Sequence, residues 1–268
     1  MPKPARVVFI GWGAINSRVG QLLIARQSAL EIAAIATIDT PEARSQLPAG
    51  VPFLASDEAL LSLKPDLVVE AAGRAAIRQW APAALAAAPR MIVASTSAFS
   101  DDGLLSWLTD LAERNQSRIE LPSGSIGGID ALASAAVLGL DEVVHQIIKP
   151  PLAWKGTRAE QLTDLASLSE RKVLFAGSAR EAASSYPQNA NATVVTALAG
   201  IGLDRTCVEI VADPAISVNS HTISASGPFG RMQITLENKP LATNPKSSEL
   251  TALSLVRLIE HTTSNIVV

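Results

Sequence analysis

Residues 9–20, FIGWGAINSRVG, give the strongest indication of the fold of this chain. Gly11 and Gly13 fit a G-x-G-x-x-G pattern, but Asn16 stands where the third glycine would be. In that pattern the first glycine permits a tight turn, the second lets a pyrophosphate approach the backbone, and the third allows close helix–strand packing. Only the packing position is altered, and Gly20, one helical turn later, is expected to let the helix lie close to the sheet. The stretch therefore predicts a dinucleotide-binding turn; the alternative is a Gly-rich turn that binds nothing.

The neighbouring segments supply the context that this motif needs. An apolar run at 6–10 precedes the turn, and residues 14–28 follow it with apolar side chains at helical spacing. Further strands are predicted at 30–39, 65–73 and 90–97, separated by helical segments near 58–63, 75–87 and 103–115. Alternating strands and helices predict a parallel sheet covered on both faces. Residues 1–121 therefore predict a Rossmann-type, doubly wound α/β domain.

The pattern changes after residue 121, which predicts a second, mixed α/β domain over residues 122–243. A Gly/Ser loop at 121–128 opens an apolar helix, and 189–203 predicts another helix. Strands are predicted at 142–154, 206–227 and 231–237, the last with one face toward water because its apolar and polar residues alternate. Residues 244–268 predict an amphipathic helix with Ser247 or Ser248 near its N-cap.

Composition narrows the classes of function. The 268 residues carry a net charge of −3 without a cluster of Lys and Arg, which argues against nucleic acid and membrane surfaces as partners. Cys207 is the one cysteine, so a disulfide framework is excluded and a reducing compartment is favoured. We find no secretory signal, no apolar run that could span a bilayer and no Cys/His cluster typical of a metal site. We expect a cytoplasmic protein without a bound metal.

Candidate cofactor residues follow from the turn. Backbone N–H groups of Gly11, Gly13, Ala14 and Ile15 would meet the pyrophosphate of NAD or NADP at the helix N-terminus. Asp39, at the end of the second predicted strand, is placed to bind the adenosine ribose, which favours NAD while NADP stays tolerated. The alternative is that Asp39 only starts the turn DTPEAR.

The chain offers few candidates for acid–base chemistry. Of its three histidines, His145 lies in an apolar strand pattern that indicates a structural role, and His261 lies near the end of the last helix. His221 lies among polar residues just before a hairpin and is the candidate for catalysis. Lys149 could bind a substrate carboxylate, or it could be a solvated lysine at a strand end. Asn189 and Asn191 could simply cap a helix.

Eight segments, in order along nearly the whole chain, resemble the L-aspartate dehydrogenase family, two-domain amino-acid dehydrogenases linked to NAD biosynthesis. They are IGWGAI (10–15), VVEAAG (68–73), PSGSIGGIDAL (122–132), KPPLAWKGT (149–157), NANATVVTALAGIGLDRT (189–206), VADP (211–214), NSHTISASGPFG (219–230) and NPKSSELTALSLVRLI (244–259). Two features depart from the family pattern: Asn16, and the unusually polar segment STSAFSDDGL at 95–104.

The resemblance implies roles for particular residues. Ser125 and Asn191 match positions that bind the nicotinamide cofactor, and His221 matches the catalytic histidine. It also implies that the C-terminal helix completes the first domain and that the chain forms a homodimer. The implied reaction is NAD(P)-dependent oxidation of L-aspartate to iminoaspartate, which hydrolyses to oxaloacetate and ammonia. The alternatives are a homoserine- or dihydrodipicolinate-type dehydrogenase or reductase, and an NAD(H) sensor without turnover.

Overall fold

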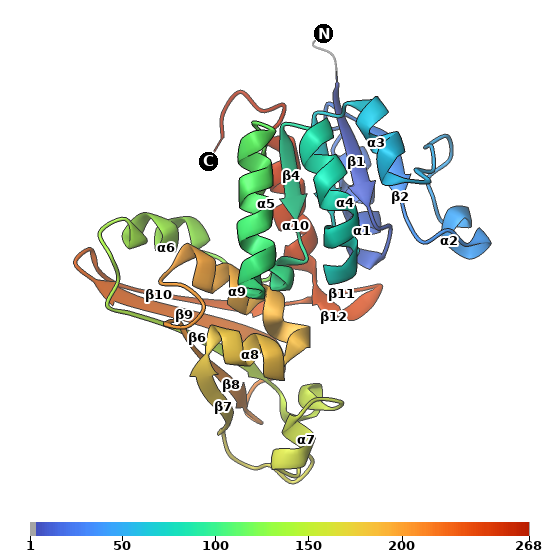
Figure 1. Ribbon diagram of the computed structural model, residues 1–268. Helices are drawn as coiled ribbons and strands as arrows, with labels where there is room; N and C mark the ends of the chain where they lie inside the picture. The colour runs from blue at the N-terminus through green and yellow to red at the C-terminus, as the bar shows by residue number, and fades with distance from the viewer. Residues whose placement is uncertain (1–3, 268) are drawn as a thin grey trace. The chain divides into compact units, whose positions relative to one another are not determined.

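The computed structural model describes residues 4–267, which form two compact units (Figure 1). One unit takes in the chain up to Gly124 together with Leu241–Ser247 and the residues from Thr251 on. The other consists of Ser125–Pro240 and Ser248–Leu250. Each unit has its own sheet of five strands.

The first unit contains the predicted parallel sheet, with strand order β2-β1-β3-β4-β5. Its strands are β1 (Ala5–Ile10), β2 (Leu30–Ala36), β3 (Leu67–Glu70), β4 (Arg90–Val93) and β5 (Arg118–Glu120). The helices are α1 (Ala14–Ala25), α2 (Pro41–Ser45), α3 (Asp57–Leu63), α4 (Arg74–Ala87), α5 (Asp102–Arg114) and α10 (Glu249–Glu260), with the 3₁₀ helix η1 (Thr96–Ser100). The sheet is confirmed, and β5 adds a strand that the sequence did not predict.

The C-terminal helix α10 helps to cover one face of this sheet, beside α1. Its buried residues Leu255 and Ile259 belong to the same core cluster as Phe9 of β1 and Leu23 of α1. Helices α3, α4 and α5 pack in sequence next to one another (Figure 1). Ser248 caps α10 as predicted, because its hydroxyl accepts a hydrogen bond from the backbone N–H of Leu250.

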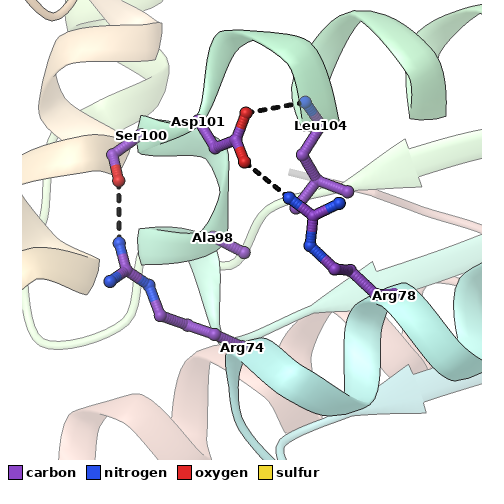
Figure 2. A pocket seen from close by; sticks show the side chains of 6 residues that line it. All are labelled: Arg74, Arg78, Ala98, Ser100, Asp101 and Leu104. Carbon is purple, nitrogen blue, oxygen red and sulfur yellow. Dashed lines mark hydrogen bonds and ion pairs between the residues drawn. The ribbon is translucent and has the colours of Figure 1, made fainter.

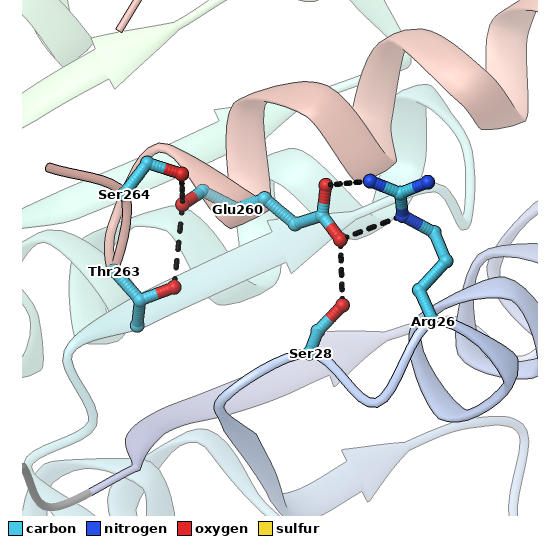
Figure 3. Close-up of polar contacts among 5 residues, drawn as sticks. All are labelled: Arg26, Ser28, Glu260, Thr263 and Ser264. Atoms are coloured by element: carbon cyan, nitrogen blue, oxygen red, sulfur yellow. Dashed lines mark hydrogen bonds and ion pairs between the residues drawn. The ribbon is translucent and has the colours of Figure 1, made fainter. Parts of the chain in front are cut away.

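An ion pair joins the end of α10 to the end of α1 (Figure 3). The guanidinium of Arg26 donates two hydrogen bonds to the Glu260 carboxylate, at 2.8 and 2.9 Å, and the Ser28 hydroxyl donates a third at 2.6 Å. These three donors lower the pKa of Glu260, so the carboxylate stays ionised at neutral pH. The contact fixes the chain end against the first βα unit.

The second unit has a mixed sheet in the order β10-β9-β6-β8-β7, in which β6 and β8 are parallel and the other pairs antiparallel. Its strands are β6 (Glu142–Lys149), β7 (Lys172–Ser178), β8 (Cys207–Ala212), β9 (Asn219–Gly227) and β10 (Gly230–Asn238). The helices are α6 (Ile129–Ala136), α7 (Ala159–Leu162), α8 (Ala179–Ser185) and α9 (Ala190–Ala199), with the 3₁₀ helices η2 (Pro151–Trp154) and η3 (Pro187–Asn189). A short ladder of β11 (Pro240–Leu241) and β12 (Asn244–Ser248) follows.

The mixed sheet confirms the predicted class of the second domain. Met232, Ile234 and Leu236 of β10 are partly buried while their neighbours are exposed, as the alternating pattern predicted. Helix α9 packs between α6 and α8. Strand β7 and helix α8 are additions to the predicted elements.

Candidate active site

His221 lies near the start of β9, the strand between β6 and β10. In the antiparallel register, His221 pairs with Ile147 of β6, and His145 of β6 pairs with Ile223. The two histidines are therefore diagonal neighbours, close enough on one face of the sheet for their side chains to meet. His221 is 7% exposed and His145 is fully buried.

A chain of hydrogen bonds runs from His221 into the interior of the second unit. Nδ1 of His221 lies 3.0 Å from Nε2 of His145. Nδ1 of His145 lies 3.0 Å from the Thr196 hydroxyl of α9, which is also 3.0 Å from the carbonyl oxygen of Ala192. This uses both nitrogens of His145 and leaves Nε2 of His221 at the open end of the chain.

Ser125, a predicted cofactor residue, lies at that open end. Its hydroxyl is 3.5 Å from Nε2 of His221, and its carbonyl oxygen accepts a hydrogen bond of 2.8 Å from the Asn238 amide. The Asn238 contact fixes the loop before α6 against the end of β10. The other residue that the resemblance assigned to the cofactor, Asn191, is exposed in the first turn of α9.

Lys149, at the end of β6, is partly buried and has specific partners. Its ammonium group donates a hydrogen bond of 2.8 Å to Oδ1 of Asn189 and lies 4.7 Å from the centre of the Trp154 ring. Burial lowers the pKa of Lys149 to about 8, because the protein interior disfavours the charged form. The interpretation of Lys149 as a solvated strand-end lysine is therefore wrong.

Asn189 is more than a helix cap. It stands before α9 but makes no side-chain cap hydrogen bond, so that alternative is wrong for this residue. Its Oδ1 accepts from Lys149, while its buried Nδ2 has no partner among the described residues. A buried N–H donor without an acceptor is costly unless a ligand or water supplies one. Lys149 and Asn189 together thus offer adjacent donors suited to a carboxylate.

Electrostatics keep His221 uncharged in this unliganded arrangement. Its pKa is lowered well below 6.5, first by burial and then by His145 and the positive charge of Lys149. Burial also lowers the pKa of His145 to about 3. Both rings are therefore neutral at physiological pH. A neutral imidazole with a free ring nitrogen is able to accept a proton.

In the first unit, the Gly-rich turn has the geometry that a dinucleotide requires. Gly11 has a φ of +85°, and a Cβ there would lie 2.7 Å from the Cβ of Ala72. Gly13 precedes α1, and a Cβ at this residue would meet no atom within 4 Å. Helix α1 has neither a side-chain cap nor an acidic residue in its first turn, so its N–H groups, including those near Ala14 and Ile15, suit an anionic pyrophosphate.

Asn16 takes the place of the third glycine by turning its amide beneath the loop. Its fully buried Nδ2 donates to the carbonyl oxygens of Gly11, at 2.8 Å, and Ile10, at 3.2 Å. Gly20 has a different role from the predicted one of bringing the helix close to the sheet. A Cβ at Gly20 would lie 2.6 Å from the Trp12 ring, so this glycine makes room for the indole.

Asp39 lies just beyond β2 and pairs with Arg44. The guanidinium donates to Oδ1 at 2.7 Å and lies over the Phe53 ring at 4.0 Å. Both side chains of the pair are exposed. The structure thus joins the carboxylate expected to favour NAD with an arginine, the type of residue that can accommodate the 2′-phosphate of NADP.

Glu70, at the end of β3, is a buried carboxylate that the sequence did not single out. It accepts hydrogen bonds from the backbone N–H groups of Ala72, Gly73 and Ser95 and from the Ser95 hydroxyl. Burial is the largest influence on its pKa, which is raised, while the hydrogen bonds act in the opposite direction. Glu70 therefore fixes the turns that follow β3 and β4, at the sheet edge where parallel sheets bind ligands.

A cavity of about 320 Å³ lies next to these turns, between α4 and η1 (Figure 2). Arg74 donates hydrogen bonds to the Ser97 carbonyl and the Ser100 hydroxyl, and Arg78 pairs with Asp101 at 2.5 Å. An anion entering here would compete with Asp101 for Arg78. The polar segment 95–104 thus provides partners for two arginines of α4.

The parallel sheet with its Gly-rich turn at Gly11 and Gly13, and the second α/β unit with its buried His221, are together the features of an NAD(P)-binding dehydrogenase. Residues 11–122 match the family "Homoserine dehydrogenase, NAD binding domain", and residues 130–262 match "Aspartate dehydrogenase, C-terminal". The chain belongs to the L-aspartate dehydrogenase family.

Individual relatives agree with this assignment. The chain is 50% identical to the L-aspartate dehydrogenase of Brucella anthropi, over 98% of both chains. It is 42% identical to the L-aspartate dehydrogenase of a Polaromonas species, over 95% of this chain and 96% of the other. The crystal structure of aspartate dehydrogenase from Thermotoga maritima superimposes with a TM-score of 0.77 at 27% identity, covering 98% of this chain and 99% of that one.

Two further findings concern helices that could span a membrane and groups of side chains that could hold a metal ion. Within residues 4–267, no helix is long and apolar enough to cross a bilayer. The same part of the chain contains no group of three side chains placed to hold a metal ion.

Proposed function

We propose that this protein oxidises L-aspartate to iminoaspartate with NAD or NADP, and that His221 is its acid–base residue. The observation that carries the proposal is the polar cluster of the second unit. It combines a neutral histidine with an open Nε2 and, nearby, the donors of Lys149 and Asn189. An amino acid with a carboxylate needs both a proton acceptor and a carboxylate partner.

The turn of Gly11 and Gly13 would hold the dinucleotide, which would supply the hydride acceptor. Lys149 and Asn189 bind a carboxylate of the substrate and hold its amine in place. As the Cα–H bond breaks and the C=N bond forms, Nε2 of His221 accepts a proton from the substrate nitrogen. The imine then adds water to give oxaloacetate and ammonia, with His221 returning its proton to the leaving nitrogen.

Binding of the substrate carboxylates also changes the pKa of His221. In the free protein the charge of Lys149 helps to lower the pKa of His221. A bound carboxylate neutralises that charge, so the pKa of His221 rises toward the range where it accepts a proton near neutral pH. Substrate binding and proton transfer are coupled in this way.

Replacing His221 tests the proposal directly. A positioned acid–base group contributes about 10²–10⁴-fold in rate, so His221→Ala should lose activity on that scale. His221→Asn should be nearly as poor, because an amide does not transfer protons. The measurement is NADH or NADPH formation at saturating aspartate, with cofactor binding followed by fluorescence as the control for folding.

Substrate identity is tested separately. Initial rates with aspartate, glutamate, alanine and homoserine, each with NAD and with NADP, should be highest with aspartate. Faster oxidation of homoserine would contradict the proposed substrate, and cofactor binding without turnover of any of the four would indicate a sensor. The proposal extends to a cytoplasmic homodimer, for which light scattering of the purified protein should give twice the mass of 28.0 kDa.

A further inference from the structure

Thr196 is a buried hydroxyl that the proposed reaction does not use, and it ends the hydrogen-bond chain that begins at His221. One hydroxyl proton faces two acceptors there: the Ala192 carbonyl and Nδ1 of His145, each at 3.0 Å. The choice between them sets the protonation of every nitrogen along the chain. Proton positions on histidine rings follow from the network of hydrogen bonds.

Two neutral arrangements satisfy the distances. In the first, Thr196 donates to Ala192, Nδ1–H of His145 donates to Thr196, and Nδ1–H of His221 donates to Nε2 of His145. Nε2 of His221 then carries a lone pair. In the second, Thr196 donates to His145, every bond reverses, and Nε2 of His221 carries a hydrogen.

The first arrangement makes one more hydrogen bond. In the first, Thr196 adds a side-chain hydrogen bond to the Ala192 carbonyl, whereas in the second that bond is absent. The contact of Ser125 with Nε2 of His221 does not separate the two, because a hydroxyl can donate or accept. One additional buried hydrogen bond favours the first arrangement by about fivefold.

We propose that Thr196, acting through His145, holds His221 as the tautomer that is protonated at Nδ1 and open at Nε2. Both are positioning residues: Thr196 does not touch His221, and His145 contacts only the far side of its ring. The pKa of His145, about 3, keeps it neutral, so it orients His221 without taking the proton itself. An aspartate does this in serine proteases, but a neutral partner leaves the pKa of His221 low.

The first arrangement of hydrogen bonds also stabilises His221 when its ring is protonated on both nitrogens. When Nε2 of His221 gains a proton, Nδ1–H continues to donate to His145, and no bond between His221 and Ala192 has to reverse; only the Ser125 hydroxyl turns from donor to acceptor. The bond strengthens because its donor is now charged. The groups that face His221 are Ser125 from the loop before α6 and His145 and Lys149 from β6. The inference concerns the tautomer, and its catalytic consequence rests on the proposed role of His221.

Thr196→Val is the direct test, because valine keeps the shape of threonine and removes the hydroxyl. Nδ1–H of His145 would then be buried without an acceptor, which favours the reversed arrangement by roughly 5-fold to 100-fold. The competent tautomer would fall to a minor fraction, and turnover should fall about 5-fold to 80-fold with the KM for NAD(P) unchanged. Thr196→Ser keeps the hydroxyl and should stay within about threefold of wild type.

The tautomer itself can be read by NMR. The chain has three histidines, so ¹⁵N-histidine labelling gives three rings, and His261→Asn removes the third. In wild type we expect Nε2 of His221 to show the ¹⁵N chemical shift of an unprotonated ring nitrogen. In Thr196→Val it should show that of a protonated nitrogen, and in Thr196→Ser the wild-type shift should return.

The two measurements separate the inference from the proposed function. An Nε2 of His221 that is protonated in wild type, or unchanged in Thr196→Val, would overturn the inference whatever the activity. A tautomer change without loss of turnover would support the control by Thr196 and contradict His221 as the base.

Discussion

Lys149→Met removes the ammonium group beside Asn189 while keeping an unbranched side chain to pack against Trp154. We expect the KM for aspartate to rise and turnover at saturation to change less. A hydrogen bond to a charged group is worth about 1.5–3 kcal/mol, which corresponds to a rise in KM of about 10-fold to 150-fold. Lys155→Met is the matched control, since Lys155 is exposed on the neighbouring segment and should leave the KM within about twofold.

The pH dependence of the KM for aspartate gives a second test of the hypothesis that Lys149 binds a substrate carboxylate. Lysine is charged below its pKa, and the pKa of Lys149 is about 8. About nine-tenths of the free enzyme therefore carries the ammonium at pH ~7 and about one-tenth at pH ~9. The KM should rise about tenfold over that interval. In the free enzyme His221 stays neutral over this interval, because its pKa is lowered well below 6.5.

The assay is the initial rate of NAD(P)H formation at saturating cofactor, across that pH range. The amino group of aspartate titrates too, so inhibition by succinate, which has the two carboxylates but no amine, is measured in parallel. Inhibition by succinate should weaken with rising pH in wild type and in Lys155→Met. It should show no such trend in Lys149→Met. A flat profile in wild type, or an equal slope in Lys149→Met, would refute the carboxylate role of Lys149.

Two predictions concern the cofactor. Asn16→Gly removes the amide that binds the Gly11 and Ile10 carbonyls, so the KM for NAD(P) should change by up to about fivefold while turnover changes less. Equal cofactor constants in the two proteins would show that this amide does not shape the turn. Asp39→Ser removes a carboxylate that repels a 2′-phosphate and frees Arg44 to bind one, so the NADP/NAD ratio of kcat/KM should rise about tenfold or more. An unchanged ratio would place the discriminating residue elsewhere.

Much of the fold was predictable because its signals are local. The first four strands of the parallel sheet are apolar runs buried on both faces, and the turn at Gly11 marks the first of them. Strand β5 was missed because its three residues, Arg118–Glu120, are charged at both ends and half exposed. Strand β7 was missed because it is an edge strand in which Leu174 alone is buried and the apolar Val173 is exposed.

The candidate site was predictable only in part, because its geometry depends on pairing between distant segments. His221 stood out by its polar neighbours, but its contact with His145 follows from the register of β9 on β6. The interpretation of His145 as a purely structural residue therefore missed its bond to His221. Glu70 was interpreted as part of an apolar strand. No local feature of the sequence indicates that four hydrogen-bond donors surround its carboxylate.

The position of α10 has a consequence for how the protein is made. The dinucleotide-binding unit starts with β1, but its core includes Leu255 and Ile259 from the last helix, and Glu260 pairs with Arg26 (Figure 3). On the ribosome, the first 124 residues emerge well before these side chains, and the whole second unit is synthesised in between. One face of the parallel sheet therefore keeps part of its apolar surface uncovered until α10 has been synthesised. A chain that stops before α10 would lack this cover, so its dinucleotide-binding unit would keep an exposed apolar face.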